Sequence, residues 1–445
     1  DAFSSTMLAG AIGVAAVMLF MICVYRLPGV ISAITLAVYI FVVFLLYNAM
    51  GAVFTLSGIA ALVLGVGMAV DSNILTFERI KESMYAGRSV KTAFREGSKD
   101  SFRTIVDAQL TTFISALILY IFGTGSVKGF ATMLIVSTIT TLLLIVFIVR
   151  FLLGLLVNSG YLDERYELFG VKKSDVSKGE ERRKFTKFKG FDFVGKAKYF
   201  VCTSLAVLVI SIVCMGVNGF SGNGVMNLGI DFTSGTTLTI QSDAAIDQDT
   251  LESQLEELGL DPSSVKINGS ESNIASVYLK DAVDADTMST VKASLQETYG
   301  HEVTDNTVTP VIGQELVRNA VIISVLAWIG ILIYMSVRFK WDYALSAIVA
   351  LIHDVLIILA FCAIFRLEIN TEIVAVLLTS IGYSVNNSIV VFDRIRDRVR
   401  AHRGRIAKEE YRELVNEAIQ ATCTRSVFST LTTMLPVIFL LFMGS

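Results

Sequence analysis

The chain has 445 residues, of which 53% are hydrophobic and 17% are charged, and its mean hydropathy is +0.65. No soluble domain needs that much apolar surface, so the composition excludes a soluble globular protein and indicates a polytopic membrane protein. The net charge of −3 says little as a sum, and the five cysteines lie in or beside apolar segments, which gives no sign of a disulfide framework.

Ten apolar segments are each long enough to cross a hydrocarbon core of about 30 Å. The loops 79–103, 150–198 and 394–425 are rich in Lys and Arg, and they fall on one side when the spans alternate. That side is predicted to be cytoplasmic, because positive charge is retained there. The predicted spans are 7–25, 29–47, 52–78, 104–123, 130–150, 199–217, 317–337, 342–364, 372–392 and 426–443.

Residues 219–310 are predicted to lie outside the cytoplasm, because they contain few bases and many acids. Their pattern predicts the order βαββαβ, which is typical of a ferredoxin-like α+β domain. The expected strands lie within 229–240 and at 265–267, 275–279 and 302–311, and the expected helices at 247–258 and 284–299.

Three polar segments are expected on the cytoplasmic side. Segments 80–102 and 397–421 are amphipathic and are predicted to lie along the membrane surface as helices. Residues 158–198 form a predicted basic linker that lies against anionic lipid. Contact of this linker with a cytoplasmic partner is the alternative.

Asp71 stands in an apolar run with no neutralising charge beside it, and Arg79 follows only two helical turns later, roughly 12 Å along the axis. A carboxylate at that depth is costly, so we expect a functional site on an ion or proton path. The alternative is a structural Asp that is hydrogen-bonded to a neighbouring helix.

The sequence pattern of stretch 65–81, around Asp71, is repeated at 381–396. Superposing Phe77 on Phe392 places Asp71 on Asn386 and Ser72 on Asn387. Both helices run from outside to inside, which favours two parallel repeats about an axis along the membrane normal. The expected fold class is therefore a polytopic α-helical membrane protein with two parallel pseudo-repeats and a small exported α+β domain.

Other buried polar residues are further candidates. Asp107 is expected to face Asp71 across the half-bundle, with Thr111 and Thr112 as hydroxyl partners, and a plain interhelical hydrogen bond is the alternative. Arg425 is a candidate counter-charge for an intramembrane carboxylate, with a snorkelling interfacial Arg as the alternative.

The adjacent His353 and Asp354 are a candidate proton-relay pair within a span, since His titrates near neutral pH. Neighbouring residues on a helix diverge by about 100°, so we expect that the two side chains do not point to one spot. Structural packing is the alternative.

No energy source or catalytic centre is visible in the sequence. The glycines at 123–129 lack phosphate-loop spacing and fit an external turn. No activated nucleophile, metal cluster or cofactor motif is apparent, so we expect neither an enzyme nor a bound cofactor. Work done by this chain is expected to use an ion gradient or a partner.

Several motifs resemble the SecDF family of bacterial protein-export membrane proteins, in its fused SecD–SecF form within the RND superfamily. Stretch 65–81 resembles the SecD signature, and 230–235, 351–355, 381–396 and 424–433 resemble SecF. This resemblance implies an accessory subunit of the Sec translocase in the bacterial inner membrane, which uses protons or sodium ions to promote late export. The implied partners are the SecYEG channel complex, SecA-driven preproteins, YajC, YidC and membrane lipid, but no nucleic acid.

The family's coupling residues fall on Asp71, Asn387 and Arg425. The family has Asp at the second position, and an amide is also lost at Phe428. Asn387 cannot lose a proton, which leaves three readings: a variant that leans on Asp71 and Asp354, a protein locked in one state, or a different coupling ion. A neutral amide can still ligate Na⁺.

The resemblance also implies a division of the chain and leaves two rivals. We expect the chain to be a piece of a longer protein that lacks the family's first helix, large exported domain and last helix. An RND-type small-molecule or lipid exporter and a non-transporting scaffold are the alternative functions. The expected parts are a SecD-like bundle at 1–157, the linker at 158–198, a first SecF-like helix at 199–218, the exported domain at 219–310 and a SecF-like bundle at 311–445.

Overall fold

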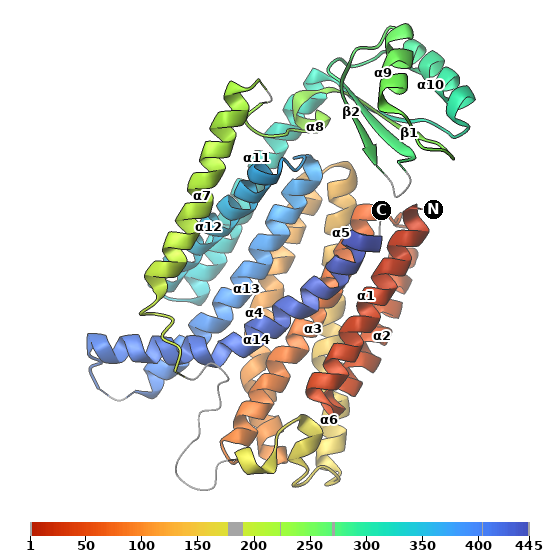
Figure 1. The fold of residues 1–445 in the computed structure, drawn as a ribbon. Helices are drawn as coiled ribbons and strands as arrows, with labels where there is room; N and C mark the ends of the chain where they lie inside the picture. Colours follow the sequence, from red (N-terminus) through yellow and green to blue (C-terminus); the bar gives the residue numbers. More distant parts are fainter. Residues whose placement is uncertain (1, 177–189, 223, 269–271, 403, 444–445) are drawn as a thin grey trace. The chain divides into compact units, whose positions relative to one another are not determined.

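A computed structural model describes residues 2–176, 190–222, 224–268, 272–402 and 404–443. Within these ranges, ten helices are long and apolar enough to cross a membrane, which confirms the predicted helical membrane fold (Figure 1). The fifth is interrupted by one π-helical turn, η1, between α5 and α6. The helices are α1 (Ala2–Tyr25), α2 (Leu27–Ala49), α3 (Leu56–Tyr85), α4 (Val90–Phe122), α5 (Gly125–Thr140) with η1 (Thr141–Ile145) and α6 (Val146–Asn158), α7 (Ala197–Phe220), α11 (Pro310–Arg338), α12 (Trp341–Phe365), α13 (Thr371–Ala401) and α14 (Lys408–Met443).

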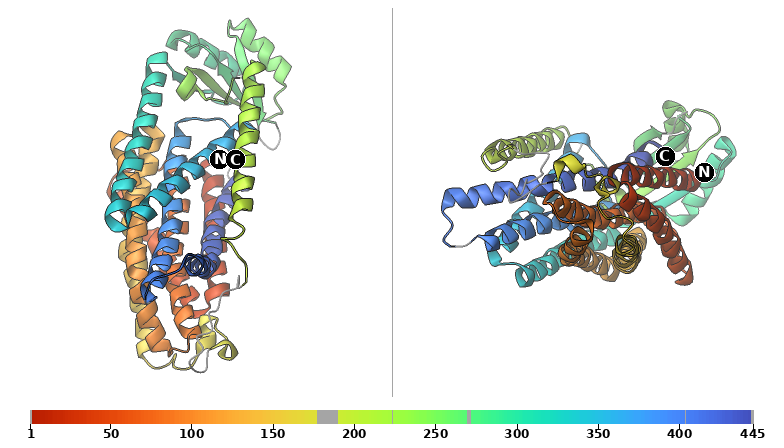
Figure 2. Two further views of the ribbon diagram at one scale, coloured as in Figure 1. Left: turned by 90° about the vertical axis from the view of Figure 1, so that its left-hand side faces the viewer. Right: turned by 90° about the horizontal axis from the view of Figure 1, so that it is seen from below.

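The chain divides into two compact units, of which the first is a helix bundle made of residues 1–208, 326–357 and 375–445. Helix α3 is its central element, because 89% of its most apolar 18-residue window is buried. It packs against α4, α5 and α14, and α14 also packs along α1 (Figures 1 and 2). The carboxylate predicted to be functional, Asp71, therefore lies on the most enclosed helix.

Small residues let α3 and α14 approach closely near Asp71. A Cβ atom added at Gly67 would lie 3.0 Å from Thr433 Oγ1 and 3.1 Å from Thr433 Cα. Thr55 caps the start of α3 by accepting a hydrogen bond of 3.0 Å from the Gly58 amide. Gly67 thus allows the close packing that brings α14 to the carboxylate.

The expectation of a surface helix at 80–102 was wrong, and segment 397–421 is not a single helix, because α13 ends at Ala401 and α14 begins at Lys408. Helix α3 runs to Tyr85, and α4 continues unbroken from Val90 into its span. A Cβ at Gly97 would lie 2.7 Å from the Ile80 backbone nitrogen, so the apolar faces of the two helix ends bury each other instead of facing lipid. Only the first part of α14 runs across the direction of the other helices (Figures 1 and 2).

Part of the predicted linker lies outside the described residues, at 177–189. Residues 191–195, which follow it, dock on the first part of α14. Asn416 accepts a hydrogen bond of 2.8 Å from the Phe193 amide, and Arg412 pairs with Asp192 at 2.9 Å. The short 3₁₀ helices η2 (Tyr166–Phe169) and η3 (Lys173–Asp175) precede the gap.

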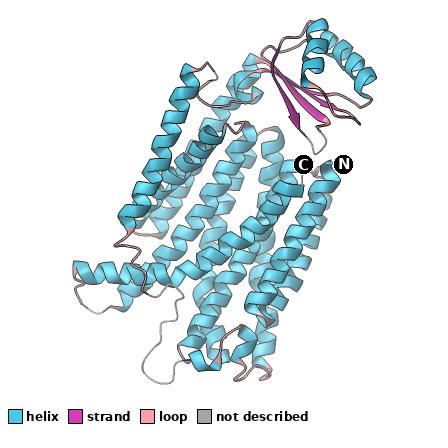
Figure 3. Cartoon of the chain, viewed as in Figure 1, coloured by secondary structure: helices cyan, strands magenta, loops and turns pink. Residues whose placement is uncertain are grey.

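The second unit, residues 209–325 and 358–374, contains a four-stranded antiparallel sheet (Figure 3). The strand order β2-β3-β1-β4 and the element order confirm the predicted βαββαβ pattern. One face packs its apolar residues, such as Leu238 and Val277, against Leu251 and Leu295 of the helices. The elements are β1 (Gly235–Gln241), α9 (Gln248–Glu257), β2 (Pro262–Asn268), β3 (Ile274–Leu279), α10 (Ala285–Tyr299) and β4 (Thr304–Val308).

Two boundaries of this domain differ from the prediction. Residues 230–233 form a single helical turn, α8 (Ile230–Thr233), so the first strand begins later than expected. The last strand ends at Val308, because Pro310 starts α11 and has no amide hydrogen for a strand ladder.

Two carboxylates cap the helices of this domain and predict an acid-sensitive stability. The Thr250 hydroxyl and amide donate to Asp247, and the Thr287 amide and hydroxyl donate to Asp284, which lowers the pKa of each carboxyl. Because the folded pKa lies below the unfolded value of about 3.9, the stabilisation is complete above that pH and is lost as pH falls through the folded pKa. We expect the protein to melt higher than an Asp247→Asn/Asp284→Asn variant at pH 7, with an advantage that shrinks as the pH falls below the unfolded value of about 3.9. Thermal melts across pH check this, and a constant difference would contradict it.

Candidate functional site

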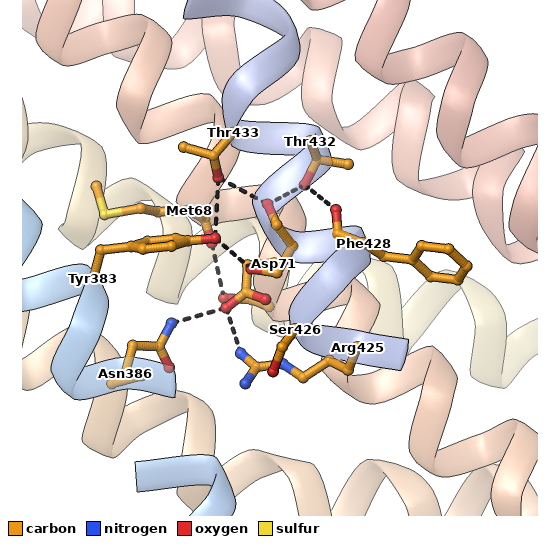
Figure 4. Close-up of polar contacts among 12 residues, drawn as sticks. Met68, Asp71, Tyr383, Asn386, Arg425, Ser426, Phe428, Thr432 and Thr433 are labelled. Carbon is orange, nitrogen blue, oxygen red and sulfur yellow. Dashed lines mark hydrogen bonds and ion pairs between the residues drawn. The ribbon is translucent and has the colours of Figure 1, made fainter. Parts of the chain in front are cut away.

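The centre of the bundle contains an almost completely buried ion pair. Arg425 Nη2 on α14 donates to Asp71 Oδ2 on α3 at 2.5 Å, and the two residues are only 3% and 2% exposed. Figure 4 shows Arg425 and Asn386 reaching Asp71 from two neighbouring helices. Burying two charges is costly, so a pair at this depth has to be held by good geometry and further hydrogen bonds.

Some polar atoms of this ion pair lack hydrogen bonds. Asp71 Oδ1 is buried and has no hydrogen-bond partner among the described residues, and the same holds for Arg425 Nε and Nη1. Unpaired polar atoms cost free energy in a dry interior. The pair therefore has spare donor and acceptor positions for another group or ion.

Asn386, and not the predicted Asn387, completes the contact from α13. Its Nδ2 donates to Asp71 Oδ2 at 2.8 Å, whereas Asn387 Oδ1 is buried without a hydrogen-bond partner in the described part of the chain. Adjacent helix positions differ by about 100°, so only one of the two amides can face α3. The alignment of the two repeated stretches places Asp71 on Asn386, and Asn386 is the residue that contacts Asp71 in the structure.

A group of hydroxyls beside the pair was not found by reading the sequence. Tyr383 and Ser429 are hydrogen-bonded at 2.7 Å. The Thr433 hydroxyl donates to Tyr383 at 3.4 Å (Figure 4). On α4, Gln109 donates to Ser72 at 3.3 Å, next to Asp71 in sequence. Tyr383 lies inside the repeated stretch, but the aligned Met68 is apolar and gave no signal.

A cavity of about 890 Å³ leads to this pair from the side predicted to be cytoplasmic. Charged side chains of both signs line it, including Glu78, Glu82, Arg394 and Arg398, and Arg425 is part of its wall. Its charges pair between the repeats: Arg394 of α13 binds Glu82 of α3, and Arg79 of α3 lies 4.0 Å from Asp393 of α13. The cavity thus gives a route lined by charged side chains to Arg425 of the buried pair.

Asp107 does not face Asp71, contrary to the prediction. Arg338 Nε on α11 donates to its Oδ2 at 2.6 Å, and the Tyr334 hydroxyl donates to its Oδ1 at 2.8 Å. Thr111 and Thr112 both donate to the Ala108 carbonyl oxygen and not to Asp107. Asp107 points away because an Arg more than two hundred residues later meets it, and both of its oxygens are occupied.

His353 and Asp354 do meet, although the helical geometry predicted that they would diverge. His353 Nδ1 and Asp354 Oδ1 are 2.9 Å apart, because the two side chains bend toward a common direction. Ser384 of α13 donates to the other oxygen of Asp354, and Ser204 of α7 is hydrogen-bonded to His353 Nε2. His353 and Asp354 are 45% and 38% exposed, so this cluster is far less enclosed than the Asp71 pair.

Among the described residues, no set of three or more His, Cys, Asp and Glu side chains is arranged to hold a metal ion. The site therefore combines one carboxylate, one guanidinium and one amide beside a polar cavity.

Comparison with known proteins gives a consistent picture. The family model for protein export membrane protein SecD/SecF, C-terminal, matches residues 1–159 and 290–445, and that for the SecD/SecF GG motif matches 222–246. The chain is 44% identical to protein translocase subunit SecDF of Bacillus subtilis (strain 168), over 100% of this chain and 60% of the relative. It is 34% identical to the Thermus thermophilus SecDF subunit, over 84% of this chain and 48% of that one.

Solved structures agree with these matches. The crystal structure of SecDF from Thermus, described as a translocon-associated membrane protein, superposes with a TM-score of 0.84 at 31% identity, and the alignment covers 99% of this chain and 58% of that one. SecDF in a super-membrane-facing form gives 0.72 at 32% identity, with 100% and 58% covered. The chain thus spans roughly half of the length of the curated relatives that it matches.

Proposed function

The chain belongs to the protein export membrane protein SecD/SecF family, and on that premise we propose that it uses an ion gradient to promote a late step of protein export across the bacterial inner membrane. The observation that carries the proposal is the buried pair of Asp71 and Arg425 beside a polar cavity. A charge pair in a dry core is a poor means of stabilisation, but it can be rearranged by one arriving cation.

The proposed step is a competition between an ion and Arg425 for Asp71. In the structure, Asp71 Oδ2 holds both Arg425 of α14 and Asn386 of α13. A proton or sodium ion that enters through the cavity neutralises the carboxylate and weakens both contacts. Helices α13 and α14 are then free to shift against α3, so ion loading biases the bundle between two arrangements.

The coupling ion is proposed to be H⁺ or Na⁺, and the site offers chemistry for each. Asp71 alone suffices for a proton, since only its protonation state has to change. The unpartnered oxygens Asp71 Oδ1 and Asn386 Oδ1 are ligands of the type that hard cations prefer. Asp107 is assigned a structural role instead, because Arg338 and Tyr334 already occupy both of its oxygens.

The proposed partners follow from the family. The curated relatives are named protein translocase subunits, which places this family with the Sec translocon. For this chain we propose the SecYEG channel and preproteins moved by SecA as partners, with YajC and YidC as further neighbours in the membrane.

The test is the dependence of export on the gradient. Membrane vesicles that contain the protein should export a preprotein faster with an imposed ion gradient, and an uncoupler should remove that increment. A scaffold that only assembles the translocon would stimulate export equally with and without the uncoupler. A deletion strain that became drug-sensitive without accumulating preprotein would instead favour a small-molecule exporter.

A further inference from the structure

The turn between α12 and α13, residues 366–370, is paired with the segment that leads into the exported domain. Leu228 and Ile369 form a parallel β-bridge, in which the Gly229 amide donates to the Ile369 carbonyl oxygen at 2.9 Å and the Ile369 amide donates to the Asn227 carbonyl oxygen at 2.8 Å. The Arg366 side chain donates to the Gly224 carbonyl oxygen at 2.9 Å. Two segments about 140 residues apart in sequence are therefore joined by main-chain bonds.

Asp231, two residues after Gly229, caps α13 from outside that helix. Its Oδ2 accepts hydrogen bonds from the Thr371 amide at 3.0 Å and from the Thr371 hydroxyl at 2.8 Å. A carboxylate at a helix N-terminus satisfies an otherwise unpaired amide and interacts favourably with the helix dipole. The N-terminus of α13 is thus capped by a residue of the exported domain and not by a residue next to it in sequence.

A third attachment connects the same turn to the face of the sheet that does not pack against α9 and α10. Glu368 accepts a hydrogen bond of 2.8 Å from the Tyr278 hydroxyl of β3 and lies 3.9 Å from Lys266 of β2. A cavity of about 290 Å³ lies among Asp231, Tyr278, Glu368 and the neighbouring strands. None of these residues belongs to the apolar core that holds the sheet to α9 and α10.

Helix α13 connects this attachment to the ion site. It runs without a break from Thr371 to Ala401, and Asn386 lies on it about 22 Å from Thr371. A continuous helix can pass an axial shift or a rotation from one end to the other, and α13 contains neither a Pro nor a π-helical turn. A change in the contact between Asn386 and Asp71 would then displace the helix end that the exported domain holds.

We infer that Asp231, Glu368 and the 227–229/369 pairing form a coupling clamp that transmits movement of α13 to the exported domain. The inference rests on the proposed function and names its mechanical link. Asp231 and Glu368 are positioning residues in this account, because they bind no ion and no exported chain. Loosening the clamp should uncouple ion movement from export without disturbing either the Asp71 pair or the core of the domain.

The experiment uses a reversible disulfide across the clamp. In a background without the five native cysteines, Asp231→Cys and Thr371→Cys are introduced together, which removes the cap when reduced and ties the same two positions when oxidised. Ion flux and preprotein export are measured in the same vesicles. We expect the reduced form to keep its ion flux but lose most of the gradient-stimulated export, and the oxidised form to recover export.

The outcomes separate the clamp from the proposed function. Normal stimulated export in the reduced form, or no recovery once the disulfide has formed, would overturn the clamp. Absence of any gradient effect in the parent protein would overturn the proposed function instead. Asp231→Asn, which keeps a capping oxygen, should retain most coupling. Asp305→Ala is the matched control, because Asp305 lines the same cavity but pairs with Lys292 of α10 at 2.9 Å.

Discussion

Replacing Asp71 by Asn is expected to abolish gradient-stimulated export and to leave export without a gradient unchanged. Asn cannot take up a proton, and it offers no charge for Arg425 or for a sodium ion to balance. One elementary charge that crosses a potential of 100 mV supplies about 2.3 kcal/mol, which biases two arrangements by about 50-fold. The variant should lose that bias. Export rates in vesicles with and without an imposed gradient measure it.

Asp107→Asn is the matched control for this prediction. It also removes a buried carboxylate from an Arg pair, but one that the structure connects to Arg338 and Tyr334 and not to the central site. We expect it to lower stability and to keep the gradient-stimulated part of export. The mechanism would be contradicted if Asp71→Asn responded to the gradient like the parent, or if both variants lost the response equally at equal protein levels.

The second large effect is expected for Arg425→Gln. Among the described residues, this change leaves the Asn386 amide as the hydrogen-bond partner of a buried, charged Asp71. Removing one partner of a buried pair costs about 3–5 kcal/mol. The free energy of unfolding in detergent, from denaturant titration, should fall by that amount.

A double variant separates stability from ion coupling. Asp71→Asn with Arg425→Gln removes both charges, so most of the lost stability should return, whereas gradient-stimulated export should stay absent. The coupling free energy from the double-mutant cycle is expected to be well above the ~0.5 kcal/mol found for independent sites. Additive effects would show that the two side chains do not interact as the structure has them.

The spans were predictable because ~20 apolar residues in a row leave few alternatives. Their ends were not. The amphipathic continuations of α3, α4 and α13 look like surface helices in sequence, and only tertiary packing, such as that of Gly97 on Ile80, shows that they extend the spans. The βαββαβ order was readable because caps such as Asp247 and Asp284 mark the helix starts.

The site was predictable in part. Asp71 stands out because a lone carboxylate is costly within a membrane span. Arg425 stands out because it is an intramembrane basic residue that can neutralise a carboxylate. The choice between Asn386 and Asn387 depends on helix rotation, which a motif does not encode. The partner of Asp107 lies 231 residues away, beyond any local pattern. The main-chain pairing of 227–229 with Ile369 left no signal in side-chain types at all.

The unbroken course of α13 has one more consequence. Thermodynamic linkage is reciprocal. If a bound cation changes the conformational equilibrium of the exported domain by some factor, a load that shifts this equilibrium changes the affinity for the cation by the same factor. A polypeptide stalled outside would then act as a brake on ion flow, and its release would let the flow resume. Tension applied to residues 235–308 should accordingly be measurable as a change in ion affinity about 22 Å away along one helix.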